Sequence, residues 1–149
     1  MAAPRVENPR LKDLEVSVYH VWFSPKKRKA ALDGDIGQAA REELVQIAKA
    51  KAIKLLECEI GYDHVHMLIE LGESQTLPAV MHQLKGAGAH RLFQRFPNLK
   101  MDLGHISFWQ RGYGSRRLQP YEIPVVQTYI FKHRELLEPR VFNPRIAPT

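Results

Sequence analysis

The sequence predicts an α+β fold in which a ferredoxin-like antiparallel sheet has helices on one face and is followed by a C-terminal helix. The first observation is the order of the periodic segments: strand, helix, strand, strand, helix, strand, helix, which is the βαββαβ order with one helix added. The second is composition: 149 residues, 44% hydrophobic and 26% charged, suffice for one domain with a packed core. We expect a single domain over residues 1–149, with flexible arms at about 1–13 and 138–149.

The strands are predicted from period-two alternation and from β-branched and aromatic residues. Residues 14–23 are rich in Val, Tyr, Trp and Phe, and residues 53–60 give the second strand. A short turn then leads into the third strand, which ends at Leu71, so these two strands should be antiparallel neighbours. The aromatic segment 105–113 predicts the fourth strand.

The helices are predicted from apolar residues at helical spacing over about 33–51, 76–96 and 120–137. Thr76 is a candidate N-cap of the second helix. Two glycines, Gly86 and Gly88, lie inside this helix and cost roughly 1 kcal/mol each relative to alanine. Such a cost indicates close approach by another helix, which is the commoner reason, or by a nucleic acid.

Charge and cysteine content restrict the class of protein. The net charge of +6 and the pI of about 9.6 favour a polyanionic partner. The single cysteine, Cys58, excludes an internal disulfide and fits a reducing compartment, and we predict for it a half-buried strand position. No apolar run is long enough for a membrane span and the N-terminus lacks a signal-peptide pattern, so a cytoplasmic protein is expected.

His64 and His66 form the first candidate site. They lie two residues apart on a predicted strand and therefore point to the same face, where both imidazoles can bind one metal ion. Asp63 could serve as a ligand or as a hydrogen-bonding partner of a ligand. His20 on the first strand could share this sheet face, although a buried histidine satisfied by one hydrogen bond is the commoner case. The pair alone is a weak signal.

The C-terminal helix offers further groups for this site. Tyr129 and His133 are four residues apart and so lie on one helical face. If that face packs on the open side of the sheet, His133 can be a third metal ligand and the Tyr129 hydroxyl can attack a phosphate polarised by the ion. The alternative is an ordinary tyrosine packed on the helix with its hydroxyl at the surface.

Basic residues beside aromatic ones suit single-stranded nucleic acid, because bases stack on the rings and phosphates pair with the cations. Each of these residues alone is more often a surface charge. The candidates for phosphate contacts are Lys85, Arg91, Arg111, Arg116 and Arg117.

Taken together, four short motifs resemble the small single-tyrosine HUH transposases, the transposase A proteins of compact insertion sequences, with the REP-associated tyrosine transposases as relatives. The resemblance covers residues 18 to about 133. The motifs occur in the family's order and at about its spacing: His64-Val65-His66, Lys85-Gly86, the aromatic run from Phe108 to Tyr113, and Tyr129-Ile130.

The resemblance implies a homodimer that cleaves and rejoins single-stranded DNA at the hairpin-flanked ends of an insertion sequence. The matching tyrosine, Tyr129, would form a 5′-phosphotyrosine and release a 3′-hydroxyl. His64 and His66 match the metal-binding pair, with Mg²⁺ or Mn²⁺ as the usual ion. His133 stands where the family often has glutamine, which leaves the metal preference open. In several family members the tyrosine helix serves the partner's histidine pair, so the site could form in cis or in trans.

Two other functions remain open from the sequence. One is a domesticated protein that binds DNA hairpins without transposition activity. The other is a metal-dependent phosphodiesterase that uses metal-bound water and forms no covalent intermediate. Only the transposase and its covalent chemistry require the Tyr129 hydroxyl.

Overall fold

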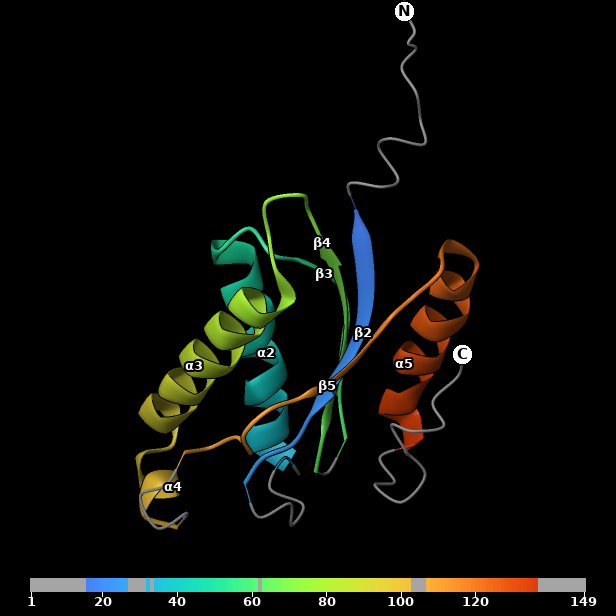
Figure 1. Cartoon of the computed structure of the whole chain (residues 1–149). Helices are drawn as coiled ribbons and strands as arrows, with labels where there is room; N and C mark the ends of the chain where they lie inside the picture. The colour runs from blue at the N-terminus through green and yellow to red at the C-terminus, as the bar shows by residue number, and fades with distance from the viewer. Residues whose placement is uncertain (1–15, 27–31, 33, 62, 103–106, 137–149) are drawn as a thin grey trace, which may run out of the picture.

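The computed structural model describes residues 16–26, 32, 34–61, 63–102 and 107–136 (Figure 1). The predicted arms, 1–13 and 138–149, lie outside these residues. The elements are β2 (Ser17–Phe23), α2 (Gly34–Ala50), β3 (Lys54–Ile60), β4 (Val65–Leu71), α3 (Leu77–Arg95), α4 (Pro97–Asp102), β5 (Gly114–Arg117), the 3₁₀ helix η1 (Pro120–Glu122) and α5 (Ile123–Leu136).

The four strands form one antiparallel sheet in the order β3-β4-β2-β5. In chain order this is second, third, first, fourth, which is the ferredoxin-like arrangement that the sequence predicted. The histidine-bearing strand β4 lies inside the sheet between β3 and β2, as expected. The register places Trp22 opposite His66 and His20 opposite Leu68.

The sheet separates two apolar clusters because successive side chains of a strand point to opposite faces. Helices α2 and α3 cover one face and α5 covers the other (Figure 1). On the first face, Val65, Met67 and Ile69 join the main core with α2 and α3. On the second, Leu68 packs with Val126 and Ile130 of α5. The face that bears the histidines is therefore the face that α2 and α3 leave open.

The position of the fourth strand was predicted wrongly: it is Gly114–Arg117, not 105–113. Phe108 and Trp109 are neighbours, yet both are buried in the main core with exposed fractions of 0% and 4%. A regular strand would send two neighbouring side chains to opposite faces, so this segment cannot continue the ladder. It makes only an isolated antiparallel bridge, between Trp109 and Pro25.

Helix α3 begins as predicted, with the Thr76 hydroxyl accepting from the backbone N–H of Ala79 at 3.4 Å. Its two glycines differ. A Cβ at Gly88 would lie 3.3 Å from Leu44 Cδ2 of α2, so helix packing explains this glycine. A Cβ at Gly86 would have no neighbouring atom within 4 Å, so packing does not explain that one.

Three smaller features complete the fold. The short helix α4 begins at Pro97, directly after α3, where the sequence analysis assigned no element. Cys58 is more deeply buried than predicted, at 3% exposed, and burial raises its thiol pKa to about 12. None of the helices within the described ranges combines the length and apolar character that crossing a bilayer requires.

Candidate functional site

The two histidines of the HxH motif lie together at one end of β4. His64 and His66 are 2% and 0% exposed, and their ring centroids are 4.9 Å apart with an interplanar angle of 86°. The Asp63 carboxylate lies 2.7 Å from His64 Nδ1 and accepts its hydrogen bond. A carboxylate only accepts, so it keeps the proton on Nδ1 and leaves Nε2 as the nitrogen with a lone pair that a metal ion could use.

His20 of β2 extends this pair to a row of three buried imidazoles. It is fully buried, and its Nε2 lies 3.4 Å from His66 Nδ1 with the rings stacked at 5.6 Å. Burial, and secondarily the positive charge of Arg116, lower the pKa of His20 to about 4, so it is neutral at neutral pH. His20 thus makes the hydrogen bond that the commoner interpretation expects, with His66 as its partner; its role in the site stays a prediction.

Tyr129 of α5 reaches the same end of the sheet. Its ring centroid is 6.1 Å from that of His66, at an interplanar angle of 86°. Val126 and Ile130 of α5 are fully buried against the sheet, and Gln127 Nε2 donates to Glu57 Oε2 of β3 at 3.3 Å. Partial burial raises the pKa of the Tyr129 phenol, so it carries its proton at neutral pH.

The third proposed ligand, His133, occupies α5 one turn after Tyr129, and its side chain lies outside the described part of the chain. Among the side chains that are described, no group of three or more His, Cys, Asp or Glu is arranged to hold a metal ion. The imidazoles of His64 and His66 nevertheless fit as two ligands of an incomplete ligand set. His64 and His66 both have Nδ1 within a hydrogen-bonding contact, which is typical of imidazoles that bind metal through Nε2.

Sequence reasoning missed two neighbours of this site. The Trp22 indole packs edge-on against His20 at 4.9 Å and fills the space where Gly114 lacks a side chain. Glu59, 2% exposed, is the register partner of His66, and Arg41 Nε lies 3.7 Å from its Oε1. The alternation of β2 placed Trp22 on the histidine face, but nothing local showed that β5 would lie beneath it.

Two of the candidate DNA-binding residues lie in α3, across the sheet from the histidines (Figure 1). Lys85 Nζ donates to the carbonyl oxygens of Gln110 and Gly112 at 2.9 and 2.5 Å, and so holds the loop before β5. Arg91 pairs with Glu43 of α2 at 3.2 Å. The structure thus gives both residues an internal partner.

The other three candidates lie in or just before the edge strand β5. Arg111 is exposed in the loop that Lys85 holds. Arg116 pairs with Glu122 of η1 at 3.2 Å and lies on the histidine face, where its charge affects His20. Arg117 is exposed. Of these three, Arg116 is the register partner of His20, whereas Arg117 pairs with Tyr19 and so points to the opposite face of the sheet.

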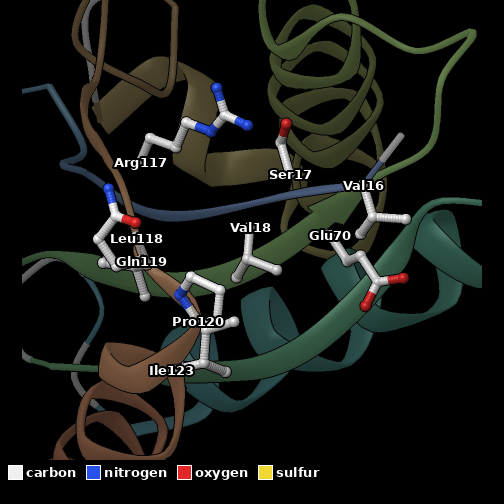
Figure 2. A pocket seen from close by; sticks show the side chains of 9 residues that line it. All are labelled: Val16, Ser17, Val18, Glu70, Arg117, Leu118, Gln119, Pro120 and Ile123. Carbon is white, nitrogen blue, oxygen red and sulfur yellow. The ribbon is translucent and has the colours of Figure 1, made fainter. Parts of the chain in front are cut away.

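A cavity of about 630 Å³ lies on the sheet beside the start of α5. Figure 2 shows Val18, Pro120 and Ile123 close together there, with Glu70 on the neighbouring strand. Val18 pairs with Glu70 at the opposite end of the β2–β4 ladder from Trp22 and His66. The cavity is therefore separate from the histidine row.

Comparison with known proteins identifies the family. The family described as "Transposase IS200 like" matches residues 14–133. This chain belongs to the IS200-like transposase family. The transposase for insertion sequence element IS200 of Salmonella typhimurium is 35% identical over 95 residues, which are 64% of this chain and 62% of that protein. The match thus spans less than two thirds of that relative. The ISDra2 transposase TnpA of Deinococcus radiodurans is 30% identical over 112 residues, 75% of this chain and 80% of that protein.

Solved structures agree with this family membership. A crystal structure of a candidate transposase from Deinococcus radiodurans R1 matches with a TM-score of 0.63 and 26% identity, covering 78% of this chain and 89% of that one. The structure of a REP-associated tyrosine transposase bound to a REP hairpin matches with a TM-score of 0.60 over 80% of this chain and 67% of that one. At 12% identity, the second match supports the fold alone.

Proposed function

We propose that this family member is a metal-dependent transposase that cleaves and rejoins single-stranded DNA at insertion-sequence ends through a covalent bond to Tyr129. The observation that carries the proposal is the position of the Tyr129 ring, 6.1 Å from His66 and on the same sheet face as the buried histidines. A phenol beside a pair of candidate metal ligands suits nucleophilic attack on a phosphate better than it suits packing alone.

The proposed step is a substitution at phosphorus. The Tyr129 oxygen forms a bond to the 5′-phosphate and its proton passes to solvent. The bond from phosphorus to the 3′-oxygen breaks, and the 3′-oxygen takes up a proton from solvent and leaves as a hydroxyl. Because burial raises the pKa of Tyr129, the phenol must lose its proton as it attacks. Rejoining reverses the step, with a 3′-hydroxyl displacing the tyrosine.

We propose that His64, His66 and His133 hold the divalent cation, Mg²⁺ or Mn²⁺. When bound, the cation would polarise the scissile phosphate and offset its negative charge. Two or three imidazoles suit Mn²⁺ better than Mg²⁺, which prefers oxygen ligands. The buried setting of His64 and His66 would exclude competing water from their side of the site.

The proposed partner is single-stranded DNA with hairpin ends, bound by a homodimer. The net charge of +6 supports an anionic partner. The three proposed phosphate contacts are Arg116, which lies on the histidine face, and Arg111 and Arg117, which are exposed in or just before β5. Lys85, Arg91 and Arg116 each have a partner within the chain. Lys85 and Arg91 also lie in α3, across the sheet from the histidines, and would contribute less.

The test is a cleavage assay on single-stranded hairpin DNA from the flanks of the gene, with Mn²⁺ or Mg²⁺, resolved on a denaturing protein gel. We expect a labelled protein–DNA adduct that Tyr129→Phe abolishes. Tyr121→Phe is the matched control, because Tyr121 lies in η1, just before α5, and is 78% exposed. Cleavage that survives Tyr129→Phe would instead indicate a phosphodiesterase, and binding without cleavage would indicate a hairpin-binding protein.

A further inference from the structure

The contact between His20 and His66 joins two strands beneath the proposed metal site. Both side chains are fully buried, their rings stack at 16°, and His20 Nε2 lies 3.4 Å from His66 Nδ1. Each residue contributes one ring nitrogen to this contact, so one of the two nitrogens must donate a hydrogen bond and the other must accept it. The direction of this hydrogen bond determines which nitrogen of His66 can bind a cation.

A proton count gives two arrangements. A neutral imidazole carries one N–H, and it binds metal only through the nitrogen without hydrogen. If His66 donates from Nδ1 to His20, then His66 Nε2 can bind the cation and the His20 proton sits on Nδ1. If His20 donates instead, the His66 proton sits on Nε2 and blocks metal binding.

The position of His20 in the sheet leaves it few partners. It is fully buried and stands opposite the apolar Leu68 in the register of β2 and β4. His20 Nδ1 is buried and has no hydrogen-bond partner among the described residues. An unsatisfied polar atom in the core is costly, and an apolar side chain at this position would avoid that cost. Packing alone therefore does not explain a histidine here.

We propose that His20 is a positioning residue: its Nε2 accepts the hydrogen bond of His66 Nδ1–H and thereby presents His66 Nε2 to the divalent cation. It acts for His66 as Asp63 acts for His64. A carboxylate can only accept, so it fixes the tautomer of its partner, whereas a neutral imidazole can donate or accept and so permits both tautomers of its partner. This inference rests on the proposed metal-binding role of His64 and His66.

The first test is Mn²⁺ titration of the full-length protein by calorimetry, without DNA. Removing the partner of a metal-binding histidine typically weakens metal affinity about 10–100-fold. We expect a loss of this size in His20→Phe, which keeps a ring and removes the acceptor. His20→Gln should restore most of the affinity, because its amide oxygen can accept from His66 Nδ1. His82→Gln, on the exposed part of α3, is the control and should bind as the unmodified protein does.

The second test reads the protons directly. Protonated and bare ring nitrogens have distinct ¹⁵N chemical shifts, and Mg²⁺ is diamagnetic. In the Mg²⁺-loaded protein we expect both His20 and His66 to carry their proton on Nδ1. A proton on His20 Nε2 in that state would overturn the proposal, and this measurement needs no variant that could fail to fold.

The outcomes separate this inference from the proposed function. If His64→Ala and His66→Ala bind Mn²⁺ as the unmodified protein does, the proposed metal site itself is wrong. If they lose binding while folded His20→Phe keeps full affinity, only the role of His20 is wrong. If His20→Phe and His20→Gln lose affinity equally, the hydrogen bond is not the cause and the positioning role is refuted.

Discussion

Gly114→Ala should disturb the histidine row through Trp22. A Cβ at Gly114 would lie 1.9 Å from Trp22 Nε1 and 2.1 Å from Cε2, both in a rigid ring. Ordinary contact begins at 3.4 Å, so the indole must retreat by roughly 1.5 Å. The same ring makes an edge contact with His20, with 4.9 Å between the ring centroids, and His20 is itself fully buried against His66. The retreat therefore displaces a side chain of the proposed site.

The expected cost is that of overpacking, about 1–3 kcal/mol of unfolding free energy. Urea denaturation of the metal-free protein measures it. A double-mutant cycle isolates its origin, because Trp22→Ala removes the ring that the new methyl group meets. We expect Gly114→Ala to cost little in the Trp22→Ala background. Mn²⁺ affinity of the single variant should fall as well, since His20 would no longer hold His66 in place.

An equal cost of Gly114→Ala with and without the Trp22 ring would refute this reasoning. It would mean that the loss comes from another neighbour of the new methyl group and not from the indole. An unchanged Mn²⁺ affinity in a destabilised Gly114→Ala protein would show that Trp22 does not affect the His20–His66 contact.

Three further predictions follow from the same geometry. Burial lowers the pKa of His20 from 6.5 to about 4, so the unfolded chain takes up this proton before the folded chain does as the pH falls. The unfolding free energy should therefore decline by about 3 kcal/mol between pH 6.5 and pH 4. The decline should be smaller in His20→Gln, and urea titrations at each pH measure both. Lys85→Met should lower the unfolding free energy by about 2 kcal/mol, because the carbonyls of Gln110 and Gly112 lose a charged donor. Arg111→Met should instead weaken DNA binding and leave the unfolding free energy unchanged. Gly86→Ala should raise the unfolding free energy by about 1 kcal/mol. Gly88→Ala should raise it by less, because the added methyl group would lie 3.3 Å from the Leu44 side chain. Equal effects of the two substitutions in thermal unfolding would contradict this.

Local patterns predicted the fold wherever one element could be judged by its own residues. The alternation in β4 placed Leu68 on the histidine face and Met67 in the main core, and both assignments are confirmed. The pattern failed at Phe108 and Trp109, where composition suggested a strand and tertiary packing buried both neighbours. The strand forms instead at Gly114–Arg117, a polar stretch with no strand signal, because the open edge of β2 supplies its hydrogen bonds.

The candidate site was predictable to the extent that its residues share an element. His64, His66 and Asp63 are adjacent in sequence, and their shared location follows from the strand period. The contact of His20 with His66 spans 46 residues and depends on the register of β2 against β4. The internal partners of Lys85 and Arg91 depend likewise on loop and helix packing. Such long-range contacts leave no trace in local spacing.

The placement of α5 bears on whether one chain or two build the active site. Val126 and Ile130 pack on the sheet of their own chain, and this brings Tyr129 to the His66 of that chain. An exchange of α5 between two copies would preserve these contacts, so the apolar burial would be the same in both arrangements. The geometry of the single chain predicts a site formed in cis. We therefore expect no covalent adduct when His66→Ala and Tyr129→Phe chains are unfolded together, refolded and given hairpin DNA with Mn²⁺. Adduct formation in that mixture would require the Tyr129 of one chain to meet the His66 of the other, and it would show that α5 is exchanged.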